Sequence, residues 1–305
     1  MRIAFIGQAR YFRAAAFEGS TKKITGKFID LDDLGLTPEL ILSEVIRFKP
    51  NLIIFFRPDF FQDIANSISN LKIAPVIGYL SEPVGRTFNF YVDNLGSRRR
   101  NLKKSLKNLK LNYVVCYTDD LAKFVSKYRK VHSIFPMPVN DNLFEKPDFK
   151  VNSSRILFIG RLNDYRIDIL NFIKHRYNPI IIDNGIDFER LNVLLQGSGA
   201  IALNIHVGKM RTFEHRTLVH MAAGHLVLSQ PLIPNFGFLP DCEYVSFTSA
   251  SDLLIKLTKI YEQPEWAEWI AVRGNQMVRR HVASEIWAEF GKTVKMWDNG
   301  DDHIL

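Results

Sequence analysis

The sequence predicts an α/β protein made of two doubly wound domains that face a cleft. Two stretches, Arg2–Gly7 and Arg155–Gly160, open in the same way, with a continuous apolar run that stops at a glycine. After each of them, short apolar runs alternate with amphipathic segments, which is typical of strands and helices in a parallel sheet. The 305 residues have room for two domains of roughly 150 residues each. We therefore expect domains at 1–144 and 155–283, a polar linker at 145–154 and a last helical segment at 284–305.

The strands of the first domain are predicted from uninterrupted apolar runs. Leu52–Phe56 has the sequence LIIFF, and strands buried on both faces of a parallel sheet have such continuous runs. The other strands of this domain are expected at Arg2–Ile6, Lys27–Asp30, Pro75–Leu80, Tyr113–Cys116 and Val131–Phe135.

The helices of the first domain are predicted between these strands. Thr37 precedes Pro38, and proline is favoured at the first position of a helix, where its missing N–H is not needed. This helix should run to about Phe48. Further helices are expected at Asp63–Leu71, over the basic segment Arg98–Lys110 and at Asp119–Tyr128, and the domain ends in the extended segment Pro136–Phe144.

The second domain continues the alternation. Its expected elements are the strand Arg155–Gly160, helix Ile167–His175, strand Pro179–Asp183, helix Asp187–Leu195, strand Ala200–Ile205, a strand at Tyr244–Phe247, a helix opened by Ser249 or Ser251, and helices Pro264–Val282 and Ser284–Met296. Within it, Arg216–Ser229 is the most informative stretch, because a helix stops at Gly224 and the strand Leu226–Leu228 follows at once. Ligands of such sheets lie beyond the carboxyl ends of the strands and near helix N-termini. A phosphate-bearing ligand is therefore expected here.

Composition indicates an ordinary globular protein, since 47% of the residues are hydrophobic and 24% are charged. The two cysteines, Cys116 and Cys242, match no metal-ligand spacing, which favours a reducing compartment. The first residues enter a strand directly, without the pattern of a signal peptide, and no apolar run approaches the ~18 residues of a membrane span. We expect a cytoplasmic protein.

A strongly basic segment carries much of the net charge of +8. Leu102, Leu106 and Leu109 recur at helical spacing within it and predict one apolar stripe. Around them lie Arg98, Arg99, Arg100, Lys103, Lys104, Lys107 and Lys110. One interpretation is a helix whose leucines face their own core while the cations are solvated. The alternatives are peripheral contact of residues 98–110 with an anionic membrane at its inner face, or with an anionic acceptor, and, least favoured, nucleic acid.

Four segments of the chain carry a family resemblance. They are Asn112–Phe144, Ile156–Arg166, Arg216–Ser229 and Phe238–Trp287. In their order and spacing they resemble the nucleotide-sugar glycosyltransferases with two Rossmann-like domains, the GT-B fold. The similarity is greatest to the spore-maturation-type branch of the group 1 transferases.

The resemblance implies a glycosyltransferase, of hexosyltransferase type, that moves a sugar from a nucleoside diphosphate, for example a UDP-sugar, to an unidentified acceptor. The donor would bind the second domain, the acceptor the first, and the last helix would cross back to the first domain. Such transferases generally need no metal and no cofactor besides the nucleotide sugar as co-substrate. Two alternatives stay open: a nucleotide-sugar epimerase on the same fold, or a non-catalytic relative that binds sugar nucleotides.

The sequence departs from the family pattern in the helix that begins near Arg216. Val219 occupies the position of a carboxylate that commonly holds the donor ribose, and Arg211 occupies the position of a glutamate found in retaining members. Glu214 lies between them, on another face or on the preceding loop. The resemblance therefore leaves the donor base, the sugar and the stereochemical outcome open.

Candidate donor-binding residues cluster after two strands of the second domain. Arg161 follows Gly160, and Arg166 comes at the start of the next helix, so that loop amides, a helix N-terminus and two guanidinium groups could clamp a diphosphate. The run after Ala200–Ile205 adds Lys209, Arg211 and Arg216 as phosphate ligands, Glu214 as a catalytic or hydroxyl-binding carboxylate, His206 and His220 as weaker candidates, and Gly224 as the small-residue stop.

Candidate residues of the first domain follow its first and fourth strands. Gly7, Gln8 and Arg10 form a strand-to-loop turn facing the expected cleft. Glu82, after Pro75–Leu80, could orient the acceptor or act as a general base, and Arg86 follows it. No pattern of acidic residues predicts a metal site.

Overall fold

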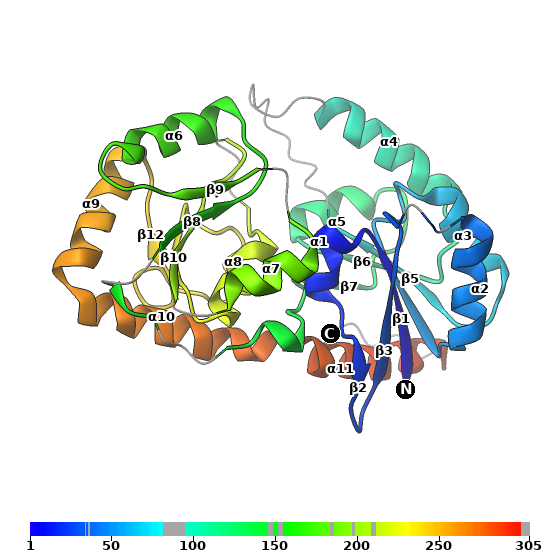
Figure 1. The fold of residues 1–305 in the computed structure, drawn as a ribbon. Helices are drawn as coiled ribbons and strands as arrows, with labels where there is room; N and C mark the ends of the chain where they lie inside the picture. The colour runs from blue at the N-terminus through cyan, green and yellow to red at the C-terminus, as the bar shows by residue number, and fades with distance from the viewer. Residues whose placement is uncertain are drawn as a thin grey trace. The chain divides into compact units, whose positions relative to one another are not determined.

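The computed structural model describes residues 1–33, 35, 37–81, 95–145, 149–151, 155–183, 186–196, 199–208 and 212–299. These residues form two compact units, each with its own sheet and helices (Figure 1). Unit 1 comprises the described residues of 1–81, 95–141 and 282–299, and unit 2 those of 142–281. Among the described residues, the chain passes from unit 1 to unit 2 after Asp141 and returns to unit 1 at Val282.

Unit 1 has a sheet in the order β2-β3-β1-β4-β5-β6-β7 among the described residues. Its strands are parallel except that β2 is antiparallel to β3. The strands are β1 (Arg2–Gly7), β2 (Gly19–Ser20), β3 (Thr25–Asp30), β4 (Leu52–Phe56), β5 (Val76–Leu80), β6 (Tyr113–Cys116) and β7 (Ser133–Ile134). The helices are α1 (Ala9–Phe12), α2 (Pro38–Phe48), α3 (Gln62–Asn70), α4 (Leu95–Asn108), α5 (Asp119–Val125) and α11 (Ala283–Asp298).

The two faces of this sheet are covered by different parts of the chain. Ala4, Ile6 and Phe55 point to a core completed by apolar residues of α2, α3, α4 and α5. Phe5 and other residues of the opposite face pack against Trp287 of α11, with ring centroids 5.5 Å apart for this pair. The Trp287 indole N–H donates to the Ala15 carbonyl at 2.8 Å, so the last helix completes the core of unit 1.

The leucine stripe of the basic segment belongs to the first of these cores. Leu102, Leu106 and Leu109 are buried there. The cations of α4 lie outside this core; for example, the Arg99 guanidinium stacks over the ring of Phe124 at 5.0 Å. The leucines therefore serve the fold, and a contact with anionic lipid or acceptor stays a prediction for the cations alone.

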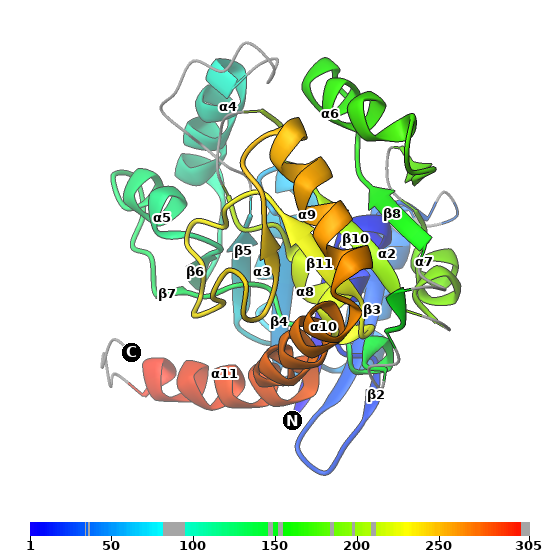
Figure 2. The same ribbon diagram turned by 90° about the vertical axis from the view of Figure 1, so that its left-hand side faces the viewer.

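Unit 2 has a parallel sheet in the order β12-β11-β10-β8-β9 among the described residues. Figure 2 shows α9 lying across this sheet, in front of β10 and β11. The strands are β8 (Arg155–Ile159), β9 (Ile180–Ile182), β10 (Ala200–Asn204), β11 (Leu226–Ser229) and β12 (Val245–Ser246). The helices are α6 (Asp164–Lys174), α7 (Phe188–Leu195), α8 (His215–Ala222), α9 (Ala250–Glu262) and α10 (Pro264–Val278).

The predicted α/β class, with two doubly wound sheets, is confirmed. Some boundaries differ for local reasons. Helix α6 begins three residues earlier than expected, because the Asn163 side chain accepts a hydrogen bond from the Arg166 amide and caps it. Phe149 and Val151 of the expected linker are buried in the core of unit 2.

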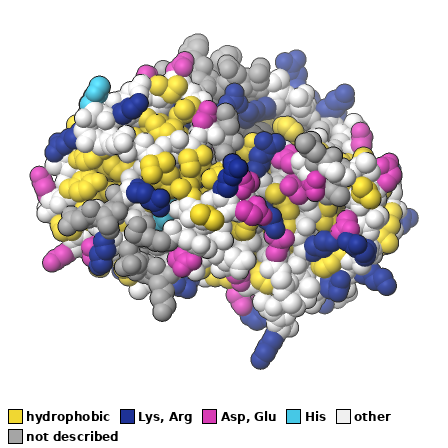
Figure 3. All heavy atoms as spheres, in the orientation of Figure 1, with side chains coloured by type: hydrophobic (Ala, Val, Ile, Leu, Met, Phe, Trp, Pro, Cys, Tyr) yellow, Lys and Arg dark blue, Asp and Glu magenta, His cyan; other side chains and the backbone are white. Residues whose placement is uncertain are grey.

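Strand β9 lies at the edge of the unit 2 sheet, and its Ile180 and Ile181 are exposed. Figure 3 shows hydrophobic side chains at the surface in this region.

Candidate functional site

The candidate site of unit 2 lies where its parallel strands end. Strands β8 and β10 are neighbours in the sheet, so the residues after them leave at the same edge. Helices α6 and α8 begin at this edge, shortly after Gly160 and His206 respectively. The arrangement combines strand carboxyl ends with helix N-termini, where parallel sheets bind anionic ligands.

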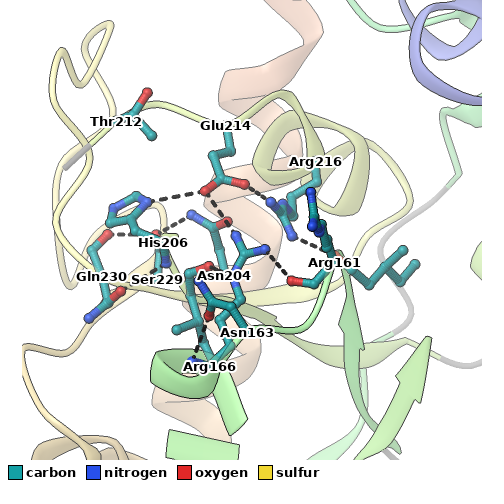
Figure 4. A network of polar contacts seen from close by, with 12 residues as sticks. Arg161, Asn163, Arg166, Asn204, His206, Thr212, Glu214, Arg216, Ser229 and Gln230 are labelled. Carbon is teal, nitrogen blue, oxygen red and sulfur yellow. Dashed lines mark hydrogen bonds and ion pairs between the residues drawn. The ribbon is translucent and has the colours of Figure 1, made fainter. Parts of the chain in front are cut away.

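A single carboxylate, Glu214, gathers three basic side chains at this edge (Figure 4). Its Oε1 accepts from Arg166 Nη2 and contacts His206 Nδ1, both at 3.4 Å. Its Oε2 is paired with Arg216. Glu214 precedes α8 in extended conformation and its side chain does not cap that helix. The carboxylate therefore contacts three basic side chains and orders them around one point.

Arg166 is a buried part of this cluster. Only 1% of the residue is exposed. Its Nε donates to the Ile205 carbonyl at 2.8 Å and its Nη1 to the Arg161 carbonyl at 2.7 Å. Burial lowers the pKa of the Arg166 guanidinium to about 10. The guanidinium thus ties the ends of β8 and β10 together and faces inward.

Arg216 and Gly160 depend on each other's geometry. Arg216 Nη1 donates to the Ile159 carbonyl at 2.5 Å, so its guanidinium lies against the end of β8. Gly160 has a φ of +157° there, and a Cβ at this position would collide with that guanidinium. The glycine that ends the strand therefore leaves room for the arginine in the first turn of α8.

Of the remaining donor-site candidates, those that the structure describes lie outside the buried cluster around Glu214. Arg161 is exposed, while its backbone carbonyl is held by Arg166. Gly224 has a φ of +77° and ends α8, at the opposite end of the helix from Arg216. Lys209 and Arg211 lie outside the described residues. Within the described chain, Arg161 and Arg216 are thus the candidates with guanidinium groups at least partly open to solvent.

The polar residues that end β10 and β11 were not singled out from the sequence. Asn204 Nδ2 donates to Ser229 Oγ at 2.9 Å, and Gln230 accepts from the His206 amide at 2.8 Å. Asn204 is 2% exposed, and its Oδ1 has no hydrogen-bond partner among the described residues. The available signal was one polar residue at the end of each otherwise apolar strand, AIALN and LVLS.

The two histidine candidates separate in the structure. His206 is part of the Glu214 cluster, and its Nε2 lies 3.1 Å from the Pro231 carbonyl. His220 lies in the core, with its Nδ1 3.1 Å from Nδ1 of His225, whose Nε2 is 3.3 Å from the Leu195 carbonyl. Burial lowers the pKa of His220 well below its ordinary value and that of His225 to about 4. This pair is neutral at physiological pH.

The candidates of unit 1 also lie at strand ends. Gln8 Nε2 and Arg10 Nε donate to the two oxygens of Asp32, at 2.8 and 2.7 Å, and the pKa of Arg10 is raised mainly by this hydrogen bond. Gly7 ends β1, and a Cβ there would lie 3.0 Å from Phe56 Cβ. Glu82 and Arg86 lie outside the described residues.

Two kinds of feature are absent from the described residues. No group of three or more His, Cys, Asp or Glu side chains in that part of the chain is placed to hold a metal ion. No helix there combines the length and the apolar character needed to cross a bilayer.

Comparison with known proteins places the fold. No family model matches the sequence, and no curated protein matches it. Anabaena HepE in complex with UDP and glucose is similar with a TM-score of 0.59, at 11% identity, over 97% of this chain and 99% of that chain. Its complex with UDP-glucose gives a TM-score of 0.58, at 11% identity, over 97% of this chain and 99% of that chain.

A second solved protein supports the same conclusion. The sucrose-phosphate synthase of Thermosynechococcus elongatus is similar with a TM-score of 0.60, at 12% identity, over 98% of this chain and 100% of that chain. At such identities the likeness concerns the fold. It confirms the GT-B fold with two Rossmann-like domains that the sequence resemblance implied, whereas the cleft between the domains stays a prediction.

Proposed function

We propose that this protein is a glycosyltransferase that moves a sugar from a nucleoside diphosphate, bound at unit 2, to an acceptor. The observation that carries the proposal is the gathering of Arg166, His206 and Arg216 around Glu214, with Arg161 held next to them by its backbone, at the strand ends where helices α6 and α8 begin. The likeness to HepE, whose structures contain UDP and UDP-glucose, supports a nucleotide-sugar ligand.

The three arginines have different roles in this proposal. Arg166 is engaged with two backbone carbonyls and Glu214, so it positions the loop and does not reach a ligand. Arg161 and Arg216 contact the diphosphate, together with the N-terminus of α8. Negative charge grows on the diphosphate as the glycosidic bond breaks, and preorganised cations stabilise that charge. Guanidinium groups thereby take the part that a divalent cation has in other transferases, and we expect activity without added metal.

Glu214 acts in this proposal as an acceptor for a ligand hydroxyl. A carboxylate has about four lone-pair positions, and Glu214 uses three of them on Arg166, His206 and Arg216 among the described residues. The remaining position on Oε2 suits a ribose or sugar hydroxyl. This contact would replace the carboxylate missing at Val219, which is buried.

The acceptor binds unit 1 in this proposal, where Gln8 and Arg10 are ordered by Asp32.

The cations of α4 form a second surface for an anionic partner. Arg100, Lys103, Lys104 and Lys107 are exposed, while the leucines between them are buried. Such a surface suits an anionic bilayer or an anionic acceptor, to which it would bind by charge alone.

The test is a turnover assay with a panel of UDP-, GDP-, ADP- and dTDP-sugars, in which nucleoside diphosphate release is measured with and without candidate acceptors. A glycosyltransferase releases diphosphate faster with an acceptor, and EDTA should leave the rate unchanged. Conversion of the sugar without acceptor would indicate the epimerase instead. Calorimetric binding without any turnover would indicate a non-catalytic relative, and absence of binding to every nucleotide would refute the proposal.

A further inference from the structure

Two exposed aromatic rings lie at the carboxyl edge of the unit 1 sheet. Tyr11 is on α1, directly after β1, and Phe60 follows β4, and they are 50% and 65% exposed. Strands β1 and β4 are parallel neighbours, with Ile6 paired to Phe55. The segments that carry the two rings therefore leave the sheet side by side. Neither ring belongs to the core of the unit.

Phe60 is fixed in place by a buried ion pair. Arg57 Nε and Nη2 donate to the two oxygens of Asp59, each at 3.0 Å, and the side chains of both residues are more than nine-tenths buried. The Arg57 guanidinium carbon lies 4.3 Å from the centroid of the Phe60 ring. The Asp59 carbonyl accepts from the Ser105 hydroxyl of α4 at 3.2 Å. The ring is thus backed by a guanidinium that cannot move freely.

The backbone at this point is strained. Arg57 has a φ of +55°, a left-handed conformation that costs on the order of 1–3 kcal/mol for a residue with a side chain. Such strain persists where the surroundings hold it, and it concentrates at ligand-binding positions. Here it turns the chain sharply after β4 and places Asp59 and Phe60 beside Arg57.

Tyr11 also lies beside an arginine, but a more exposed one, since the Arg10 side chain is 48% exposed. The Arg10 guanidinium carbon lies 5.3 Å from the Tyr11 ring centroid, and Arg10 is itself held by Asp32. Gln8 donates to the same carboxylate. Both exposed rings are therefore backed by an arginine that a carboxylate orients, at adjacent strand ends of one sheet.

We propose that Tyr11 and Phe60 form a platform that binds a saccharide ring, and that the acceptor is accordingly a carbohydrate. An exposed ring that is already held in one orientation loses little entropy on binding, which favours its use as a contact surface. The CH face of a sugar packs on such rings, while the hydroxyl edge meets the neighbouring Asp32 and Gln8. An acyl chain fits less well, because it would desolvate the partly exposed Arg10–Asp32 ion pair without replacing its hydrogen bonds to water. The identification as acceptor rests on the proposed function; binding of free saccharides does not.

The experiment is saturation-transfer NMR with the full chain and free saccharides, without nucleotide. The probes are the methyl glycosides of glucose, galactose, mannose and N-acetylglucosamine, with maltotriose and cellotriose. We expect transfer to ring protons of at least one probe, a loss of affinity of at least tenfold in Tyr11→Ala and in Phe60→Ala, and retention in Phe60→Tyr. Both alanine variants replace exposed side chains, and their melting temperatures should match the wild type.

The matched control is Trp269→Ala. Trp269 is 48% exposed on α10 of unit 2, with the Arg273 guanidinium 5.0 Å from its ring and Arg273 bonded to Glu243 at 2.8 Å. It is a similar arrangement of ring, arginine and carboxylate that belongs to unit 2, so its removal should leave saccharide binding unchanged. Equal losses in Trp269→Ala and Phe60→Ala, or no transfer to any probe by the wild type, would overturn the platform.

Calorimetry with UDP, GDP, ADP and dTDP separates this inference from the proposed function. Phe60→Ala should bind the preferred nucleotide as the wild type does. Saccharide binding without any nucleotide binding would support the platform and refute the donor site. Nucleotide binding without saccharide binding would overturn the platform and leave the transferase proposal standing.

Discussion

Replacing Glu214 by glutamine tests the centre of the proposed donor site. The substitution keeps the shape of the side chain but removes the negative charge that Arg166, His206 and Arg216 share. It also replaces one of the acceptor oxygens by an amide NH2 group, which faces the N–H groups of the neighbouring basic side chains. Arg166, 1% exposed, is then left with its two backbone carbonyls but without a counter-charge.

The expected magnitude follows from these contacts. At 3.4 Å and an effective dielectric constant near 20, the Arg166–Glu214 attraction is about 5 kcal/mol before desolvation is counted. The net worth of a hydrogen bond to a charged group is about 1.5–3 kcal/mol, and we expect the free energy of unfolding to fall by that amount. For a hydroxyl bound by Glu214, we expect at least a tenfold loss of nucleotide affinity or turnover, or ~1.4 kcal/mol.

The assay compares two ligands by calorimetry. A nucleoside diphosphate carries ribose hydroxyls and should lose at least roughly tenfold in affinity, whereas inorganic pyrophosphate has none and should not bind more weakly. Glu265→Gln, at an exposed position in the first turn of α10, is the control. Wild-type affinity and turnover in Glu214→Gln would show that the carboxylate only orders the loop. An equal loss for both ligands would show that its effect is on the phosphate site.

Further variants test the arginines of the donor site, the basic helix α4 and the buried histidine pair. Arg161→Ala should weaken nucleoside diphosphate binding by about 1.5–3 kcal/mol without a change in melting temperature, and unaltered affinity would argue against the diphosphate clamp. Arg166→Ala should instead lower the free energy of unfolding by about 3–5 kcal/mol, because it leaves part of a buried cluster unpaired. Replacing Arg98–Arg100 of α4 by glutamine should nearly abolish flotation with anionic liposomes at low salt, since each cation contributes on the order of 1 kcal/mol, and wild-type protein that stays unbound would make α4 an ordinary solvated helix. The His225 pKa of about 4 lies below its ordinary value, so the unfolded chain binds more protons between pH 6.5 and 4; stability should fall by about 3 kcal/mol as the pH drops through that window, and a His225→Gln variant with the same acid slope in chemical denaturation would refute this account.

The strands could be predicted well because burial on both faces of a sheet requires continuous apolar sequence. LIIFF at β4 and the run before Gly160 are examples. The short elements α1 and β2 could not be predicted, because four and two residues carry no usable periodicity. The buried positions of Phe149 and Val151 were missed for the same reason, since each is a single apolar residue in a polar stretch.

The site was harder to predict than the fold, because its geometry depends on tertiary contacts. Arg166 was expected on the phosphate, but it lies on the buried stripe of α6 with Ile169, Leu170 and Ile173. Arg166 lies three, four and seven residues before these neighbours, which is the spacing of one helix face. This spacing indicated a buried position, but a charged side chain is normally expected at the surface. The contact of Arg166 with Glu214 joins residues 48 positions apart, and no local pattern indicates it.

The position of α11 has a consequence for synthesis of the chain. The core on one face of the first sheet contains Trp287, which packs against Phe5, Phe56 and Tyr79. A ribosome makes those partners before unit 2 and the tryptophan after it. Unit 2, between residues 142 and 281, can thus finish folding while unit 1 still exposes a row of aromatic side chains. The strands of unit 1 are thus made before unit 2 but completed after it, and until α11 has been made they expose apolar surface of the kind that chaperones bind.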